Sequence, residues 1–283
     1  MNSLTSGVLA IAALSLLSGC GTYDDSDPFS LSPEPSPAPP MQVAVNQAPA
    51  PAAEFQTSAT PELGASAAPT ASGIEQYREE AVRDWSADIQ HFNELNQSVV
   101  QSPDAILCIG SSSFRLWETM ADDLAPYQII RRGFGGSRWS DVAVFADELI
   151  TPHQFRAVLF FVGNDIAGDA RDKSPAEVAS LFRHVSNRVR AHNPFAHIFV
   201  IPVTPTESRA FVWPLVQEAN SAIRSVCQSL GNATYIPTAD LFQGPLGEAK
   251  PELFREDRLH LNKLGYTLWS QRILQSLDAS LGQ

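Results

Sequence analysis

Short apolar segments that alternate with amphipathic helical patterns restrict the fold of this sequence more than any other feature. The apolar segments are rich in Val, Ile and Phe, and the stretches between them repeat apolar residues every three or four positions. Strands that are apolar throughout are typical of a parallel sheet covered by helices on both faces, in which sites lie beyond the carboxyl ends of the strands. We therefore expect an α/β fold. The expected strands are residues 105–109, 127–130, 157–162, 197–203 and 233–236, and the expected helices are residues 138–150, 174–192, 213–230 and 263–281.

A further amphipathic helix is expected before the first strand. Its apolar residues lie three or four positions apart, so one face of the helix can pack on the domain that follows. We place the start of the folded domain, residues 74–283, at this helix. The apolar positions are Ile74, Tyr77, Ala81, Trp85, Ile89 and Phe92.

Residues 1–19 resemble a signal peptide. The apolar run at 8–17 has the length of a signal-peptide core and is too short to span a bilayer. It continues into Leu-Ser-Gly-Cys at 17–20, which resembles a bacterial lipobox and implies a lipid anchor on Cys20. No Lys or Arg precedes the run, so a secretory signal without lipid and a misassigned start codon remain alternatives. We expect an exported lipoprotein of the cell envelope, anchored to a membrane on its periplasmic or extracellular face.

Residues 20–73 are expected to form a disordered linker rich in Pro, Ala and Ser. Such a composition cannot bury enough apolar surface to offset the loss of chain entropy, and an extended tether of this length reaches on the order of 100 Å. The first 77 residues hold seven acidic residues and no Lys or Arg, which accounts for much of the net charge of −12. A chain without a basic face is not expected to bind nucleic acid.

Two cysteines remain for the folded domain, Cys108 in an expected strand and Cys227 in an expected helix. An exported protein can join such a pair in a disulfide. Their apolar sequence surroundings favour two buried free thiols instead.

Four of the expected strands lead into segments that carry polar side chains or glycines. These segments supply hydroxyl groups, backbone N–H donors, an amide, and a histidine that follows an aspartate by three residues, which together suit acyl transfer. Taken alone, the serines are better explained as turn and helix-capping residues, and an Asx turn is an alternative role for the amide. The segments are Gly-Ser-Ser-Ser (110–113), Arg-Arg-Gly-Phe-Gly-Gly-Ser (131–137), Gly-Asn-Asp (163–165) and Arg-Glu-Asp-Arg-Leu-His-Leu-Asn (255–262).

The same segments, taken in order, resemble the four sequence blocks of the SGNH or GDSL-type serine hydrolases, over about residues 104–275. Gly110 to Ser112 match the Gly-Asp-Ser block, 131–136 match the glycine loop, 162–165 match Gly-x-Asn-Asp, and 257–260 match Asp-x-x-His. The resemblance implies a three-layer α/β/α sandwich with a flavodoxin-like, mostly parallel central sheet.

The resemblance also implies the roles of individual residues. Ser112 would be the nucleophile, His260 its base, and Asp257 the acid that orients the histidine. The backbone N–H groups of Ser112 and Gly136 and the side-chain amide of Asn164 would form the oxyanion hole. No metal-binding motif is present, and we expect neither a metal nor another cofactor.

Three positions depart from the family pattern. Ser111 stands at the usual aspartate, Arg131 often corresponds to asparagine, and Val162 followed by Gly163 displaces the usual glycine by one residue. The last departure bears on the placement of Asn164, because it lies two residues before that amide.

We therefore expect an esterase that acts on oxygen esters, either carbohydrate O-acetyl groups or short acyl and lysophospholipid esters. A catalytically silent SGNH fold that binds a glycan is the alternative from another class, and a thioesterase or protease-like activity is a third. The residues expected to line the pocket are Trp139, Phe161, Trp213 and the loop at 204–213.

Overall fold

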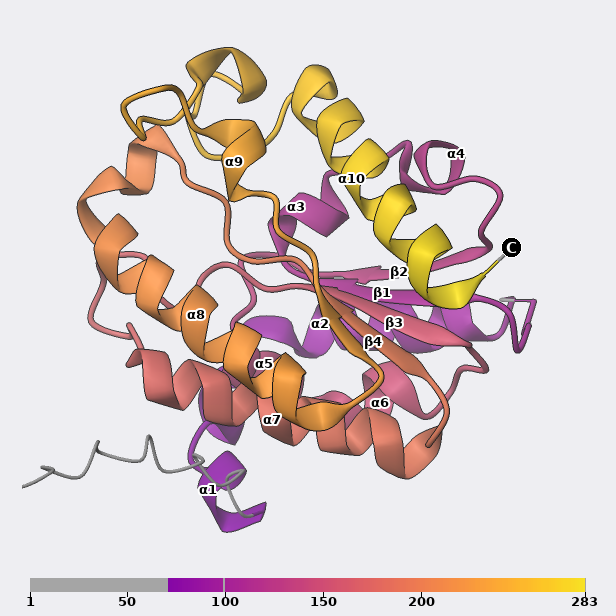
Figure 1. Ribbon diagram of the computed structural model, residues 1–283. Coiled ribbons are helices and arrows are strands. Elements are labelled where there is room, and N and C mark those ends of the chain that lie inside the picture. Colours follow the sequence, from indigo (N-terminus) through magenta and orange to yellow (C-terminus); the bar gives the residue numbers. More distant parts are fainter. Residues whose placement is uncertain (1–70, 99, 283) are drawn as a thin grey trace, which may run out of the picture. The chain divides into compact units, whose positions relative to one another are not determined.

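A computed structural model describes residues 71–98 and 100–282 of the chain. The expected signal peptide, the lipobox cysteine Cys20, and residues 20–70 of the expected linker lie outside the described residues. The described part contains a five-stranded parallel sheet with the order β2-β1-β3-β4-β5, as in flavodoxin-like doubly wound folds (Figure 1). The strands are β1 (Ile106–Gly110), β2 (Ile129–Gly133), β3 (Ala157–Phe161), β4 (His197–Val200) and β5 (Ala233–Tyr235).

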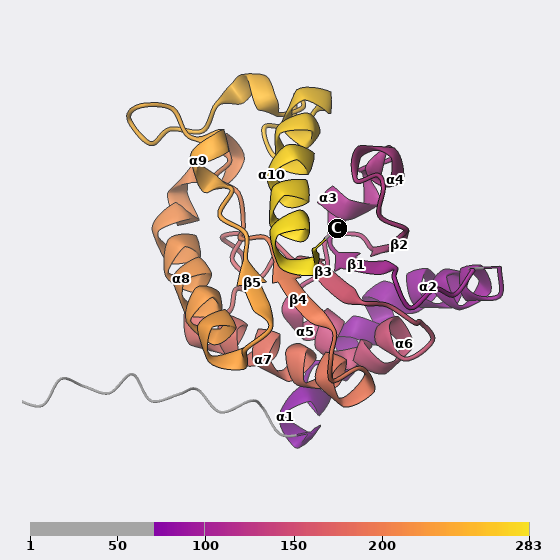
Figure 2. The same ribbon diagram turned by 45° about the vertical axis from the view of Figure 1, so that its right-hand side comes forward.

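Helices cover both faces of the sheet, as the apolar strands predict. Successive strand side chains point to opposite faces, so Leu107 and Ile109 join one core while Ile106 and Cys108 join the other. This confirms the expected three-layer α/β/α sandwich (Figures 1 and 2). One layer holds α2 (Arg78–Asn96), α5 (Trp139–Val144), α6 (Ala146–Ile150), α7 (Pro175–His192) and α8 (Trp213–Leu230); the other holds α3 (Ser112–Arg115), α4 (Met120–Asp123), α9 (Ala239–Phe242) and α10 (Lys263–Leu281).

Two helix starts follow directly from local sequence. At α7, the Ser174 side chain accepts the Glu177 N–H at 3.2 Å, and Pro175 fills the first turn, where its missing N–H costs nothing. At α10, the Asn262 side chain accepts the Gly265 N–H at 3.1 Å. This second cap lies just after the expected catalytic histidine, so the helix start and the segment at 255–262 share one local structure.

Some element boundaries differ from the sequence-based expectation. The helix expected at 138–150 is two helices, α5 and α6, because Phe145 between them leaves helical geometry at φ −100° and ψ 20°. The second strand runs from Ile129 to Gly133 at the edge of the sheet and contains two arginines, of which Arg131 is exposed and Arg132 is buried. The fourth strand ends at Val200, before Pro202, which has no N–H for a sheet ladder. A short helix, α1 (Ala71–Glu75), precedes α2, so the first expected helix is also divided.

The two cysteines of the described chain are buried free thiols on opposite faces of the sheet. Burial raises the pKa of Cys227 to about 12 and raises that of Cys108 further. The reading as free buried thiols therefore agrees with the structure. Among residues 71–98 and 100–282, no helix has the length and hydropathy needed to cross a membrane.

Candidate active site

Ser112 lies at the carboxyl edge of the sheet, two residues after the end of β1, which lies between β2 and β3. It begins the short helix α3 and is partly exposed, whereas Ser111 and Ser113 on either side are buried. The Ser111 side chain makes no capping hydrogen bond to α3. All three serines line the pocket described below, and Ser112 is the one whose hydroxyl meets a histidine.

Three side chains form an unbroken hydrogen-bonded chain at this edge. The Ser112 Oγ lies 2.9 Å from Nε2 of His260, and Nδ1 of His260 lies 2.7 Å from Oδ2 of Asp257. The other carboxylate oxygen of Asp257 accepts the backbone N–H groups of Leu259 and His260, each at 2.9 Å. The structure therefore brings together the three residues expected to form a triad.

The electrostatics of Asp257 favour an ionised carboxylate. Slight burial raises its pKa, but hydrogen bonds from the His260 side chain and from the backbone N–H groups of His260 and Leu259 outweigh this effect and lower the pKa to about 2. An ionised Asp257 can only accept from Nδ1 of His260. This assigns the proton to Nδ1 and leaves Nε2 free to accept the Ser112 proton.

The two other residues of the expected oxyanion hole lie next to each other. A Cβ added to Gly136 would lie 3.7 Å from Nδ2 of Asn164, so an oxygen can approach the Gly136 backbone from the same side as the amide. Asn164 also lines one pocket together with Ser112 and His260. Val162 is buried in the core between the sheet and the layer of α2, α5, α6, α7 and α8. Its departure from the family pattern therefore does not separate Asn164 from Gly136.

The glycine loop before Gly136 rests on helix α2. Gly135 has φ +36°, and a Cβ there would lie 1.8 Å from the ring of Trp85. That ring also packs edge-on against Phe134, with centroids 5.6 Å apart. Only glycine fits Gly135, for steric and conformational reasons, and the sequence pattern of α2 did not indicate this role of Trp85.

Arginines hold the segment that carries Asn164. Arg209 donates to the Asn164 Oδ1 and to the Gly163 carbonyl, both at 2.7 Å. Arg138 donates to the Asn164 carbonyl at 3.1 Å, and Nδ2 of Asn164 donates to the Ser137 carbonyl at 3.2 Å. The amide and backbone of Asn164 are therefore both fixed by partners that are distant in sequence.

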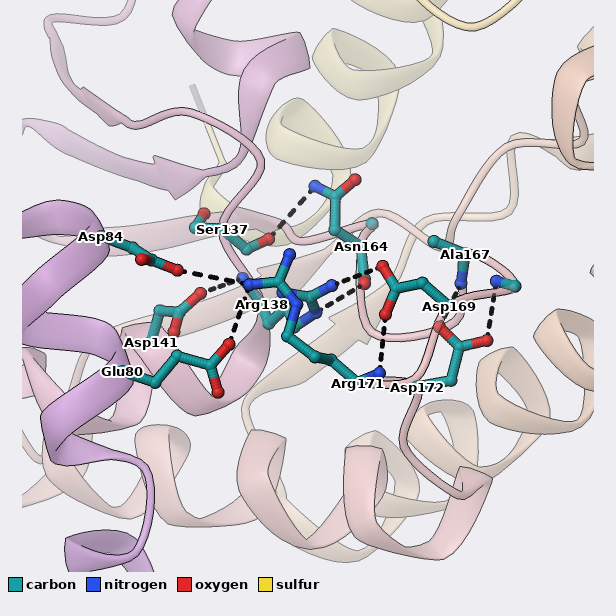
Figure 3. A network of polar contacts seen from close by, with 12 residues as sticks. Glu80, Asp84, Ser137, Arg138, Asp141, Asn164, Ala167, Asp169, Arg171 and Asp172 are labelled. Atoms are coloured by element: carbon teal, nitrogen blue, oxygen red, sulfur yellow. Dashed lines mark hydrogen bonds and ion pairs between the residues drawn. The ribbon is translucent and has the colours of Figure 1, made fainter.

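Figure 3 shows how this network extends to helix α2. Arg138 forms an ion pair with Asp169 at 2.9 Å, and Asp172 accepts the N–H groups of Ala167 and Gly168. Arg171 in turn forms ion pairs with two acidic side chains of α2, Glu80 at 2.8 Å and Asp84 at 3.3 Å. The loop at 163–173 is therefore fixed by contacts from two directions, through Arg138 on one side and through helix α2 on the other.

The comparisons with known proteins identify the family of the chain. The GDSL-like lipase/acylhydrolase family matches residues 98–268. The chain belongs to this family. The match confirms the resemblance found in the sequence, and it makes the protein a member of a family of ester hydrolases.

Solved structures of low sequence identity share the fold of this GDSL-family protein. A Streptococcus pneumonia protein provisionally named a platelet activating factor is 19% identical, with a TM-score of 0.60 over 74% of this chain and 100% of its own. A GDSL-like lipase from Bacteroides thetaiotaomicron is 14% identical, with a TM-score of 0.57 over 68% of this chain and 98% of its own. An acetylxylan esterase from Geobacillus stearothermophilus is 13% identical, with a TM-score of 0.53 over 63% of this chain and 95% of its own. No curated protein sequence matches the chain.

The pocket of this GDSL-family protein confirms most of the expected lining and corrects one residue. Phe161, Trp213 and the start of the loop at 204–213 line it. Trp139 does not line the pocket, because its ring is buried against Phe160 and Phe182 in the same core as Val162. The residues shared by the pocket and the hydrogen-bonded chain are Ser112 and His260, and the other lining residues include Thr204, Thr206, Arg209, Val216, Leu261 and Trp269.

Asp165, the last residue of the family's third block, has a structural environment unlike that of Asp257. It is buried, and its carboxylate accepts the Trp139 N–H at 3.0 Å, at the start of α5. Burial raises the pKa of Asp165 to about 7, against the opposing effects of this hydrogen bond and of Lys173. Within the described residues, no three His, Cys, Asp or Glu side chains are grouped so that they could hold a metal ion.

Sequence reasoning missed the two arginines that contact Asn164. Arg209 lies in the loop after the fourth strand, so its place at the carboxyl edge could have been inferred from the strand order. Arg138 directly follows the glycine loop. Neither position indicates a bond to Asn164, because that bond depends on the tertiary structure.

Proposed function

We propose that this protein is an exported, lipid-anchored serine esterase that hydrolyses oxygen esters through an acyl-enzyme. The observation that supports this most directly is the hydrogen-bonded chain from Asp257 through His260 to Ser112. A serine, a histidine and an ionised carboxylate in this arrangement are the parts required for nucleophilic acyl transfer.

In the proposed mechanism, Ser112 Oγ attacks the ester carbonyl carbon while Nε2 of His260 takes the hydroxyl proton. Asp257 keeps Nδ1 protonated and stabilises the positive charge that the imidazole gains. The C–O bond to the leaving alcohol then breaks, and His260 returns the proton to that alcohol. A water molecule attacks the acyl-enzyme by the same route, which releases the acid and restores Ser112.

Negative charge develops on the carbonyl oxygen during both attacks. We propose that the backbone N–H groups of Ser112 and Gly136 and the Asn164 amide donate to this oxygen. The adjacency of Gly136 and the Asn164 amide supports this assignment. One such donor contributes about 3 to 4 kcal/mol to stabilisation of the transition state.

The size of the cavity favours a short acyl group. Its volume is about 40 Å³, which is room for only a few water-sized groups, and Phe161 and Trp269 contribute to its walls. A lipid anchor on Cys20 with a long tether would place the domain near polymers of the cell envelope. We therefore propose carbohydrate O-acetyl esters as the first substrate class, with short acyl or lysophospholipid esters as the second.

The test is hydrolysis of nitrophenyl esters with acyl chains of two to twelve carbons by the full-length protein. We expect the rate to be highest for the shortest chains and to be lost in Ser112→Ala, which removes the nucleophile. Matched thioesters and amides should react more slowly than the oxygen ester. Equal inactivity of the wild type and Ser112→Ala would contradict the proposal and favour a glycan-binding protein without turnover.

A further inference from the structure

Arg209 reaches the active-site pocket from η1 (Glu207–Val212), the short 3₁₀ helix after β4. Its guanidinium donates from one nitrogen to Oδ1 of Asn164 and from the other to the Gly163 carbonyl, both at 2.7 Å. We propose that Arg209 is a positioning residue, which holds the Asn164 amide with its N–H groups toward the ester oxygen and makes them stronger donors. This inference rests on the proposed function.

The first argument concerns which way the Asn164 amide faces. The oxygen and the NH₂ group of an asparagine are nearly equal in size, so packing alone does not choose between them. An arginine has donors and no acceptor, so only Oδ1 can face Arg209. Nδ2 then faces Gly136 and the Ser137 carbonyl. A flipped amide would present an acceptor to a developing oxyanion and would repel it.

The second argument concerns charge. Arg209 is partly buried, and although burial lowers its pKa, nearby Asp172 and Asp169 oppose the shift and an arginine remains charged. A cation that donates to Oδ1 draws electron density toward that oxygen and polarises the N–H bonds at the other end of the amide. Hydrogen bonds that involve an ionised donor are about twice as strong as neutral ones.

The third argument concerns how Arg209 is itself held. The two residues before it contact the loop of the catalytic histidine. The Ser208 N–H donates to the Arg258 carbonyl at 3.3 Å, and Glu207 lies 3.7 Å from the Arg258 guanidinium. The segment at 207–209 thus contacts both the loop of Asn164 and the loop of His260. The Arg209 guanidinium donates to two acceptors at once, which the single ammonium group of a lysine cannot reproduce.

A double-mutant cycle on the full-length protein tests the inference. The four proteins are the wild type, Arg209→Met, Asn164→Ala and the double variant, each measured for kcat and KM on nitrophenyl acetate. We expect Asn164→Ala to lower kcat about 100-fold and Arg209→Met about 10-fold. If Arg209 acts through Asn164, the double variant should be within about 2-fold of Asn164→Ala. Losses that multiply would overturn the inference.

Two further variants separate positioning from general loss of structure. Arg209→Lys keeps the charge without the fork, so its kcat should lie between those of the wild type and Arg209→Met. Arg190 is the matched control, because it is also a partly buried arginine that donates to backbone carbonyls, those of Gly231 and Asn232. Arg190→Met should lower stability and leave kcat within about 2-fold. A comparable loss of kcat in Arg190→Met would overturn the specific role of Arg209.

A spectroscopic measurement keeps this inference distinguishable from the proposed function. If wild type and Ser112→Ala hydrolyse esters equally, the proposed function fails, yet the orientation of Asn164 can still be measured by NMR. We expect a nuclear Overhauser contact between the Asn164 side-chain amide protons and the α-protons of Gly136. The contact should be lost or strongly weakened in Arg209→Met. An unchanged contact would overturn the inference.

Discussion

The loop at 255–262 and the loop at 163–173 flank the same serine, but they are built in opposite ways. The first carries Asp257 and His260, is largely open to solvent, and is held mainly by short-range bonds such as the one from the Arg255 N–H to the His260 carbonyl, with weaker long-range contacts at Arg258. The second carries Asn164 and is held by side chains from remote parts of the chain. In the proposed mechanism, the residues that transfer protons therefore lie in a solvated loop, and the amide that would bind the oxyanion lies in a loop fixed by long-range contacts.

The aspartates of the two loops show the same contrast in their ionisation. Asp257 is half-exposed and accepts three donors, and its pKa is lowered to about 2. Asp165 is fully enclosed, and burial raises its pKa to about 7. The native fold therefore stabilises the charge at Asp257, where the proposed mechanism uses it, and disfavours the charge at Asp165, which serves as a hydrogen-bond acceptor for the start of α5.

The largest effect is expected from His260→Ala. Loss of the base should lower kcat by about 10⁴-fold or more, because neither proton transfer is then assisted. Stability should change by less than about 1 kcal/mol, since the side chain is partly exposed and its bonds are local. Steady-state kinetics and urea unfolding measure the two quantities. A loss of kcat below about 100-fold would indicate that another group acts as base.

The next effect concerns stability against pH in Asp165→Asn. The folded state binds a proton at Asp165 more tightly than the unfolded chain, whose aspartates have a pKa of about 3.9. Stability of the wild type should therefore fall as pH rises from about 4 to 7, by on the order of 4 kcal/mol from this group. Asp165→Asn has no ionisable group at this position, so its free energy of unfolding should not show this fall with pH. Urea unfolding of both proteins at a series of pH values from about 4 to 7 measures the difference. Parallel curves for the two proteins would contradict the raised pKa.

The smallest effect is expected from Glu207→Gln. Glu207 and Arg258 form an ion pair at 3.7 Å with both side chains largely exposed, so removing the charge should cost less than about 1 kcal/mol. The value of kcat should stay within about 2-fold. A larger change in kcat would show that the loop of His260 depends on remote contacts as the loop of Asn164 does, which would remove the contrast between them.

The contrast between the loops also explains how much of the site could be predicted from the sequence. Asp257 and His260 lie three residues apart, so their hydrogen bond depends on a single turn. Strands β1 and β3 are apolar throughout because both of their faces are buried, and this made the parallel sheet predictable. The edge that gathers Ser112, Asn164 and His260 follows from that sheet.

Features that depend on long-range packing were not predictable in the same way. The bonds from Arg138 and Arg209 to Asn164 join residues 26 and 45 positions apart. Trp139 was expected in the pocket from its position in the sequence alone, but the first turn of α5 directs its ring into the core. The break at Phe145 leaves the helical spacing of apolar residues intact, so the pattern did not reveal it.

The contact between Trp85 and Gly135 bears on where this enzyme's domain can be cut. The family match spans residues 98–268, which contain every residue assigned to the chemistry. A chain trimmed to those limits would lack α2, whose tryptophan supports the glycine loop, and would end inside α10. The smallest unit that preserves the site geometry is therefore larger than the unit defined by the family match, because it must also include α2 and the whole of α10.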